Sequence, residues 1–212
     1  MRIIDISLPL NNNTPVYPGN VSLSVSIHHA MPEHATQLSS ITFGSHTGTH
    51  VDAPSHAIEG ALTLDKIPLK NFVGPCRVLD FSKNERESVT KEMLQNKTQN
   101  KNIKAGERIL LKTKNSLRGF KDFYDDYIYL DGDAADYLAS LGVLLVGIDA
   151  LSIKKRGSDD HRPHLSLLSK NIPIVEGLNL SSVEEGEYEL VCLPLNFTDI
   201  DGAPARAILI ER

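Results

Sequence analysis

The feature that most restricts the fold of this chain is a succession of short runs of apolar and β-branched residues. The run VLLVGI at 143–148 is apolar throughout, which is typical of a strand covered on both faces. Residues 21–27 alternate apolar and polar side chains, as expected of a strand with one buried face. Similar runs occur at 2–7, 39–44, 76–81, 108–113, 172–175, 188–195 and 205–211. The sequence therefore predicts a fold in which short strands predominate.

Helical patterns are fewer than strand patterns. Capping residues followed by apolar side chains at helical spacing predict three short helices: one after Ser88 or Thr90, one after Asp131 or Asp133 that ends at Gly142, and one over residues 164–168. The expected fold class is therefore α/β, with more strand than helix.

The chain is interpreted as a single domain covering residues 1–212. Its 212 residues are enough to bury a substantial core, and no stretch rich in glycine, proline or serine divides them. Residues 83–104 are low in hydrophobicity, with many Lys, Asn, Gln and Glu side chains. We expect this segment to be a surface excursion and not a domain boundary.

Charge and hydropathy argue against several classes of function. There are 27 acidic and 22 basic residues and no dense basic cluster, so no nucleic-acid partner is expected. The longest apolar stretch, 141–151, is far shorter than the roughly 20 residues of a membrane-spanning helix. Asp5 interrupts the N-terminal apolar run, which argues against a signal peptide. Cys76 and Cys192 are therefore expected to be buried, unpaired thiols in a cytoplasmic protein.

The window SHTGTHVDAPSH at 45–56 gathers four potential metal ligands: His46, His50, Asp52 and His56. Gly48 and Pro54 oppose a helix here, so a bent loop that enters an extended segment is expected. In an extended segment His50 and Asp52 point the same way, and a turn at Gly48 would return His46 beside them. Imidazole and carboxylate ligands suit Zn²⁺, Mn²⁺ or Fe²⁺. The alternative, a polar loop with local hydrogen bonds, explains a single histidine better than it explains three.

A second polar cluster lies at 159–177. Glu176 follows the apolar run IPIV at the end of an expected buried strand, where an unpaired carboxylate is costly. His164 is the other candidate ligand of this cluster. Asp159 and Asp160 are expected to be solvated, and His161 is expected in a surface loop.

The run from His46 to His56 resembles the H-x-G-T-H-x-D-x-P-x-H signature of the cyclase family of metal-dependent hydrolases, which includes kynurenine formamidases and isatin hydrolases. Further similar segments extend over nearly the whole chain: IDISLPL near the start, VYPGN at 16–20, HLSLLSKNIPIVEGL at 164–178 and LPLNFTDIDGAPARAIL at 193–209. The resemblance implies a swivelling β/β/α fold and a homodimer.

The resemblance also implies a role for each matching residue. His46, His50 and Asp52 match ligands of a first metal. Asp52 would bridge to a second metal, which His164 would hold and Glu176 would bridge. His56 matches the catalytic acid/base, and Tyr17 falls where kynurenine formamidases often place a tryptophan that contacts substrate. Two divalent ions per chain are implied, with Zn²⁺ expected first and Mn²⁺ as the alternative.

The expected function is hydrolysis of a small amide, such as an N-formyl arylamine, by metal-activated water with His56 as acid and base. One alternative is hydrolytic ring opening of a cyclic amide or lactone. Another is a protein that binds a metal or small ligand without turnover. Histidines 28 and 29 are expected to be structural or solvated, and Arg206 is expected to be a buried, paired arginine that supports the site loop.

Overall fold

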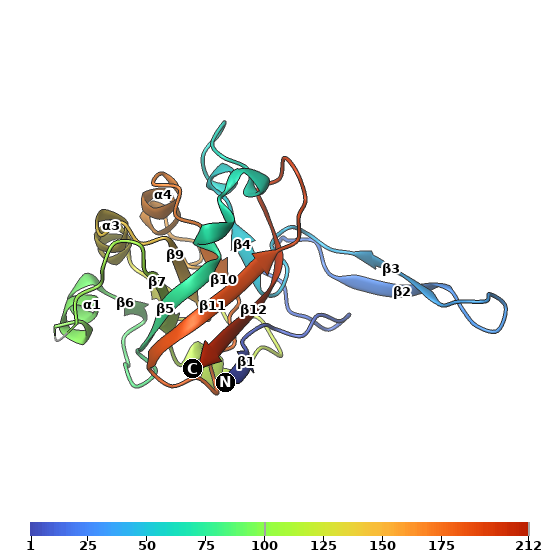
Figure 1. The fold of residues 1–212 in the computed structure, drawn as a ribbon, viewed down its shortest axis with the longest axis horizontal. Helices are drawn as coiled ribbons and strands as arrows, with labels where there is room; N and C mark the ends of the chain where they lie inside the picture. The colour runs from blue at the N-terminus through green and yellow to red at the C-terminus, as the bar shows by residue number, and fades with distance from the viewer. Residues whose placement is uncertain (100, 212) are drawn as a thin grey trace.

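The structure is a computed structural model that describes residues 1–99 and 101–211. Its centre is a sheet whose strands close into a barrel-like ring in the order β12-β11-β5-β7-β9-β10-β4, because β4 pairs back onto β12 (Figure 1). The strands of this sheet are β1 Arg2–Asp5, β4 His50–Asp52, β5 Val73–Asp80, β7 Arg108–Lys112, β9 Leu145–Ile148, β10 Ile174–Glu176, β11 Gly186–Pro194 and β12 Gly202–Glu211.

The sheet combines a parallel half with an antiparallel half. Strands β5, β7, β9 and β10 pair in parallel, whereas β1, β11, β12 and β4 make antiparallel pairs. Parallel neighbours need crossover connections, and these carry the helices α1 Lys91–Lys97, α2 Asn115–Arg118, α3 Gly132–Ser140 and α4 Arg162–Leu168. The predicted α/β class, with strands predominant, is confirmed.

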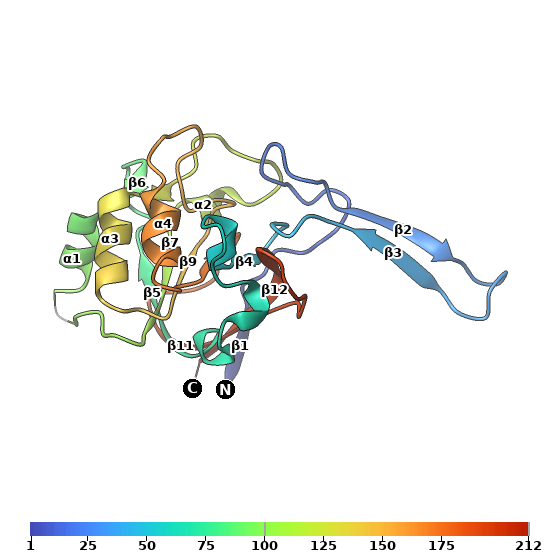
Figure 2. The same cartoon turned by 90° about the horizontal axis from the view of Figure 1, so that it is seen from above.

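Helices α1, α3 and α4 lie side by side against the parallel half of the sheet (Figure 2). Thr90 caps α1 by accepting a hydrogen bond from the backbone N–H of Met93, and Asp131 caps α3 in the same way through Ala134. The third predicted helix is also present but begins at Arg162, because Pro163 is accommodated in its first turn.

Two hydrophobic cores lie on the two faces of the sheet. One joins the helices to the parallel strands and includes Leu138, Val146 and Ile148. The other fills the ring and includes Val51 and Leu145. Strand β9 therefore contributes side chains to both cores, which confirms the two-sided burial predicted for its run.

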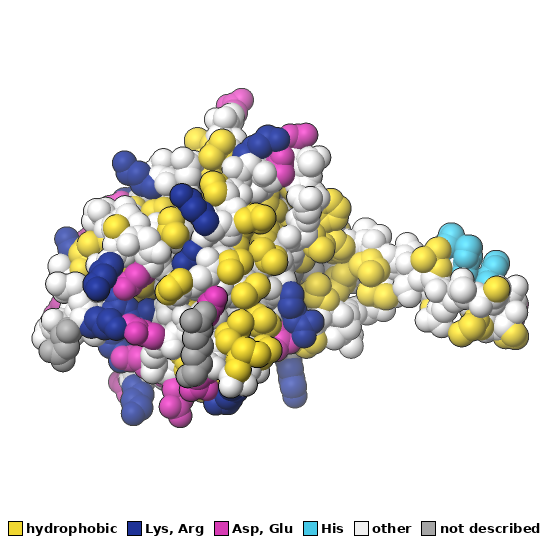
Figure 3. Space-filling view, viewed as in Figure 1, with side chains coloured by type: hydrophobic (Ala, Val, Ile, Leu, Met, Phe, Trp, Pro, Cys, Tyr) yellow, Lys and Arg dark blue, Asp and Glu magenta, His cyan; other side chains and the backbone are white. Residues whose placement is uncertain are grey.

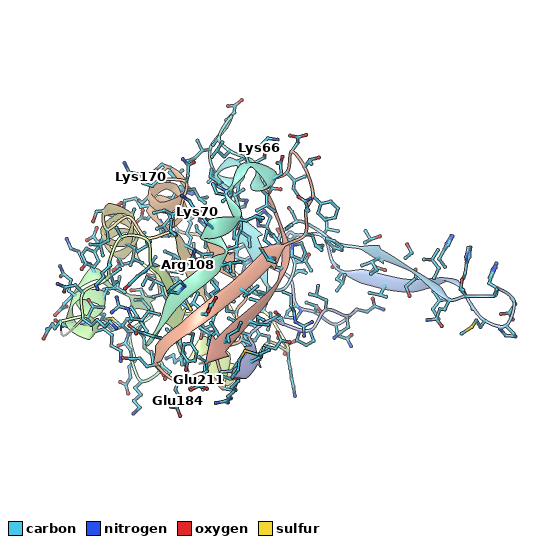
Figure 4. The ribbon with its side chains drawn as sticks, in the orientation of Figure 1. Lys66, Lys70, Arg108, Lys170, Glu184 and Glu211 are labelled. Atoms are coloured by element: carbon cyan, nitrogen blue, oxygen red, sulfur yellow. The ribbon has the colours of Figure 1, made fainter. Side chains whose placement is uncertain are left out.

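The start of β5 is held in place by Arg108 of β7, which is 3% exposed. Its guanidinium donates to the carbonyl oxygens of Lys70, Asn71, Val73 and Pro75, so the buried charge is surrounded by acceptors. Figure 4 labels Arg108 beside β5, with Lys70 near it. This contact joins the short 3₁₀ helix Leu69–Asn71 to the sheet. Another 3₁₀ turn lies at Leu64–Lys66, and a small separate sheet pairs β6 Ser88–Val89 with β8 Tyr129–Leu130.

Strands β2 Ser24–His29 and β3 Leu38–Thr42 form a hairpin that projects away from the rest of the molecule (Figures 1 and 2). We call residues 24–42 the arm. The prediction of a half-buried strand at 21–27 is confirmed only in part: Leu23 is 5% exposed, whereas Ile27 is 62% exposed and Val21 is 57% exposed. The alternation is present, but among the described strands β2 pairs only with β3.

Two further predictions need correction. Most described residues of the segment 83–104 are exposed, as expected of a surface segment, but Val89, Leu94 and Ile103 pack into the helical core, so the segment is anchored there; residue 100 lies outside the described residues. Arg206 is paired as predicted, with Asp5, but its side chain is 75% exposed and contacts β1, not the site loop.

Both cysteines are buried and unpaired, as predicted. Among the described residues, none of the helices has the length and apolar character that crossing a bilayer requires.

Candidate metal centre

Strand β4 is the centre of the site because two strands from a distant part of the chain pair with it. β10 places Glu176 directly opposite His50, and β12 places Gly202 opposite Asp52. Side chains of directly opposed residues share a face of the sheet, and so do those of residues two apart in one strand. This register brings His50, Asp52 and Glu176 together on one side.

The turn before β4 returns His46 to the same place. Gly48 adopts a left-handed φ of 62°, which reverses the chain between the two histidines. Nδ1 of His46 then lies 2.8 Å from Oδ1 of Asp52, and its Nε2 lies 2.7 Å from Oδ2 of Asp201. Both ring nitrogens of His46 therefore contact carboxylates.

His50, Asp52 and Glu176 form a buried group. Nε2 of His50 lies 3.4 Å from Oδ1 of Asp52 and 3.4 Å from Oε2 of Glu176. The opposite nitrogen, Nδ1, donates to the carbonyl oxygen of Gly48 at 2.9 Å, which orients Nε2 toward the carboxylates. Within the described part of the chain, His50 Nε2 and Asp52 Oδ2 are buried without a hydrogen-bond partner. Buried polar atoms are rarely left unsatisfied, so this pair indicates a bound cation.

His56 and His164 stand beside these groups. His56 ends the 3₁₀ helix Pro54–His56, and its ring centroid lies 4.1 Å from that of His46. Nδ1 of His56 is 3.5 Å from Oδ2 of Asp201. Nε2 of His164 lies 3.4 Å from Oε1 of Glu176 and 3.8 Å from Oδ2 of Asp52. The His56 side chain is 31% exposed and that of His164 is 14% exposed, so His56 is the more accessible imidazole.

Protons balance the charges of the group when no metal is bound. Burial disfavours a charged imidazole, but the carboxylates of Asp52 and Glu176 outweigh this and raise the pKa of His50 to about 10. Burial and Asp52 both oppose ionisation of Glu176, yet His164 and His50 lower its pKa to about 2. His46 and His50 likewise hold the pKa of Asp52 well below its usual range despite its burial. Asp52 and Glu176 are thus held ionised, and positive charge on the neighbouring imidazoles balances them.

The donor atoms and their spacing fit divalent metal ions. Two ligands that bind one tetrahedral ion at about 2.1 Å lie about 3.4 Å apart. His50 Nε2 lies 3.4 Å from each of its two carboxylates, and His164 Nε2 lies 3.4 Å from Glu176. Among the described residues, two groups have ligand atoms close enough to hold an ion, and Asp52 belongs to both: His46–Asp52–His56 and His50–Asp52–Glu176. The shared Asp52 matches the expected bridge, whereas His50 is grouped with Glu176 and His56 is grouped with His46.

A pocket of about 540 Å³ adjoins both groups, because His46, His56, His164 and Glu176 contribute to its lining. Tyr17 also lines it and packs edge-on against Phe123, with ring centroids 5.2 Å apart. This volume suits a small-molecule ligand.

The other polar residues singled out in the sequence lie outside the two ligand groups. His161 is exposed at the start of α4, as predicted, and its side chain reaches the same pocket. Asp159 and Asp160 belong to neither ligand group. His28 and His29 lie on the arm with ring centroids 4.5 Å apart, and Figure 3 shows histidine side chains near its tip.

Asp201 and Gly177 adjoin the candidate site but were not recognised in the sequence. Asp201 contacts His46 and His56, yet in the segment TDIDGAP it has only Asp199 and no histidine near it, so no ligand spacing marks it. Gly177 directly follows Glu176 with a φ of 68°. A glycine next to a candidate ligand is the signal that could have identified this turn.

Comparison with known proteins assigns the family. Residues 4–155 match the model of the family described as "Putative cyclase". The chain belongs to the cyclase family. A relative in sequence is the kynurenine formamidase of Bacillus cereus strain ATCC 10987, which is 36% identical over 208 residues, covering 97% of this chain and 96% of that protein.

Solved structures of other proteins support the cyclase-family assignment. A predicted metal-dependent hydrolase from Bacillus stearothermophilus superimposes with a TM-score of 0.85 at 36% identity, covering 100% of this chain and 98% of that one. Isatin hydrolase A from Labrenzia aggregata gives a TM-score of 0.87 at 23% identity, covering 100% and 94% of the two chains. At that identity the similarity establishes the shared fold.

Proposed function

We propose that this cyclase-family protein is a metal-dependent hydrolase that cleaves a small amide of the N-formyl arylamine type. The observation that carries the proposal is the pair of ligand groups that share Asp52 beside a pocket of small-molecule size. The full-length similarity to the kynurenine formamidase of Bacillus cereus supports an aromatic formamide as the substrate.

His46, His50, Asp52, His164 and Glu176 would hold two divalent ions, with Asp52 between them. Imidazole nitrogen and carboxylate oxygen are ligands that Zn²⁺ accepts readily, and Mn²⁺ is the alternative. When bound, such ions lower the pKa of a water molecule from 15.7 to about 7 and polarise a carbonyl group.

The protein's own groups supply the proton transfers. His56 faces the pocket and accepts a proton as water adds to the carbonyl carbon. The same imidazole then donates that proton to the nitrogen as the C–N bond breaks, so that formate and an arylamine are released. Asp201, 3.5 Å from Nδ1 of His56, orients the ring for both transfers. Tyr17 offers an aromatic surface to the aryl part of the substrate.

Ring opening of a cyclic amide is the second candidate reaction, favoured by the shared fold with isatin hydrolase A. It breaks the same type of bond, but the nitrogen stays attached to the product. A protein that only binds a metal or ligand is the third candidate; it would need no acid/base residue at the pocket, where His56 lies.

We also propose that the protein is a homodimer joined through the arm. Val25, Ile27 and Ile41 share one face of the arm, because Val25 is paired with Ile41 and lies two residues from Ile27. An isolated two-stranded hairpin is at best marginally stable in water. Figure 3 shows further apolar side chains at the base and tip of the arm. A second copy of the chain would cover this face. The cytoplasm is the proposed compartment, because both thiols are unpaired.

The decisive experiment compares two substrates. Zinc-loaded protein is assayed with N-formylkynurenine and with isatin, and chelator-treated protein is the control. We expect metal-dependent release of formate from N-formylkynurenine. If the protein hydrolyses isatin and not N-formylkynurenine, ring opening of a cyclic amide is its reaction. If the protein binds neither Zn²⁺ nor Mn²⁺, or hydrolyses neither substrate, the proposal that it is a metal-dependent hydrolase is wrong.

A further inference from the structure

The loop that follows β9 brings Lys154 to the pocket. Ile153, the preceding residue, donates its backbone N–H to Oε1 of Glu176 at 2.6 Å. The backbone N–H of Lys154 donates to Oγ of Ser152 at 3.3 Å, and its carbonyl oxygen accepts a hydrogen bond from the Tyr127 hydroxyl. The backbone at Lys154 is therefore fixed relative to a candidate metal ligand.

Lys154 differs from the two cations that follow it in the chain. Lys155 forms an ion pair with Glu87 at 2.9 Å, and Arg156 forms one with Asp125. In contrast, the residues that the structure describes include no carboxylate paired with the ammonium of Lys154. Its side chain is only partly exposed and lines the pocket.

The position of Lys154 suits recognition of an anion beside the reaction centre. Glu176, a member of one candidate ligand group, lines the same pocket as Lys154. Lys154 shares the lining of this pocket with His56 and His164, so its ammonium and the candidate reaction centre face the same space. Tyr17 and Leu165 line the same pocket and offer apolar surface to an aromatic ring.

We propose that Lys154 determines specificity by binding a carboxylate carried on the aromatic part of the substrate. This inference rests on the proposed function and extends it, since it selects aromatic formamides with an acidic substituent over neutral ones. A hydrogen bond between an ammonium and a carboxylate in a partly enclosed pocket is among the stronger polar contacts. We expect its loss to lower kcat/KM by about 10- to 100-fold, which corresponds to about 1.4–2.8 kcal/mol.

The test uses a matched pair of substrates and a matched pair of variants. Formanilide is neutral, and 2-formamidobenzoate carries the carboxylate. Lys154→Met removes the ammonium in the pocket, and Lys155→Met removes its neighbour, which pairs with Glu87 away from the pocket lining. In zinc-loaded protein, Lys154→Met should raise KM for 2-formamidobenzoate at least tenfold and change formanilide turnover by less than about twofold. Lys155→Met should change neither.

The outcomes separate this inference from the proposed function. If Lys154→Met loses the same activity on both substrates, Lys154 has a structural role. If it loses activity on neither substrate, Lys154 does not bind the substrate carboxylate. If the wild-type protein hydrolyses neither substrate, the proposed function fails, and binding of 2-formamidobenzoate is measured by calorimetry instead. Binding at least tenfold weaker in Lys154→Met than in wild type would still support the carboxylate site, whereas equal binding would overturn it.

Discussion

At the scale of single residues, Asp52 and His56 occupy different kinds of position. Asp52 is fully buried, belongs to both ligand groups and has a buried oxygen with no hydrogen-bond partner in the described part of the chain. A buried carboxylate in this state is stable only beside positive charge. His56 is partly exposed at the pocket, where it can exchange protons with a substrate.

We therefore predict that variants of these two residues fail differently. His56→Ala should keep its metal and lose about 10²-fold or more in kcat for formanilide, because the leaving nitrogen loses its proton donor. Asp52→Asn should lose metal and activity together, because an amide cannot supply the bridging negative charge. Elemental analysis and steady-state kinetics measure both effects.

Two other outcomes for His56→Ala would change the role that we assign to this residue. Loss of metal from His56→Ala would make this residue a ligand, in line with its place beside His46 and Asp52. Full amide turnover would move the acid/base role elsewhere, and His161 would be the next residue to test.

Metal binding should release protons. The raised pKa of His50, about 10, means that its imidazole is protonated at pH 7 in the metal-free protein, and the pKa of His46 is raised as well. A metal binds only the deprotonated nitrogen, so affinity should fall as pH falls, by roughly tenfold or more per pH unit between pH 8 and 6. Zinc titration calorimetry in buffers of different ionisation enthalpy should report at least one proton released at pH 7. Binding without proton release would contradict the charge balance described above.

At the scale of elements, the site depends on the contact between the turn before β4 and the turn after β10. A Cβ atom at Gly177 would lie 2.4 Å from the carbonyl oxygen of Gly48, and Gly177 also has a left-handed φ of 68°. Thr49 Oγ1 donates to the carbonyl oxygen of Gly177 at 2.6 Å. Because both turns adjoin ligands, a small displacement here would separate His50 from Glu176.

We predict that Gly177→Ala lowers the free energy of unfolding by about 2 kcal/mol or more and weakens zinc binding, since steric overlap adds to backbone strain. Gly60→Ala is the matched control: Gly60 has a φ of 72° but nothing within 4 Å of the added Cβ. That control should lose only the backbone cost of about 1–2 kcal/mol and should bind zinc normally. Thermal unfolding and zinc titration measure the two effects, and equal behaviour of the two variants would show that the turns can move apart.

At the scale of the whole molecule, the ring-shaped sheet and its helices form a packed body from which the arm projects (Figure 2). The body has its own two cores, and the arm contributes to neither. Its exposed apolar face is therefore available for association between copies of the chain.

We predict that Ile27→Glu combined with Ile41→Glu prevents formation of the proposed dimer, because the new charges would lie on the face of the arm that a second copy would cover. Ser26→Glu combined with Ser40→Glu is the control, since these paired residues lie on the opposite face. Light scattering after size-exclusion chromatography should report dimers for the wild type and the control only. If the wild type is a monomer, or if the Ile27→Glu and Ile41→Glu double variant is still a dimer, the arm does not form a dimer interface.

Much of the candidate site was predictable because its residues lie close together in the sequence. The window at 45–56 carries three candidate ligands and the candidate acid/base His56, and an extended strand after a glycine turn places His46, His50 and Asp52 together by short-range geometry alone. The N-caps Thr90 and Asp131 and the apolar run of β9 are local signals of the same kind. Such features depend on backbone preferences and side-chain period within a few residues.

Only the tertiary structure decided which distant groups meet and which apolar surfaces are covered. The pairing of β10 and β12 with β4 set Glu176 opposite His50 and brought in Asp201, which no local pattern marks. The alternation at 21–27 correctly predicted a strand and the burial of Leu23, but not the exposure of Val21 and Ile27. Side-chain alternation specifies that a strand has an apolar face, but what covers that face depends on long-range packing. The sequence by itself thus determined the candidate ligands and the elements that carry them, and the closure of the sheet determined how they are grouped.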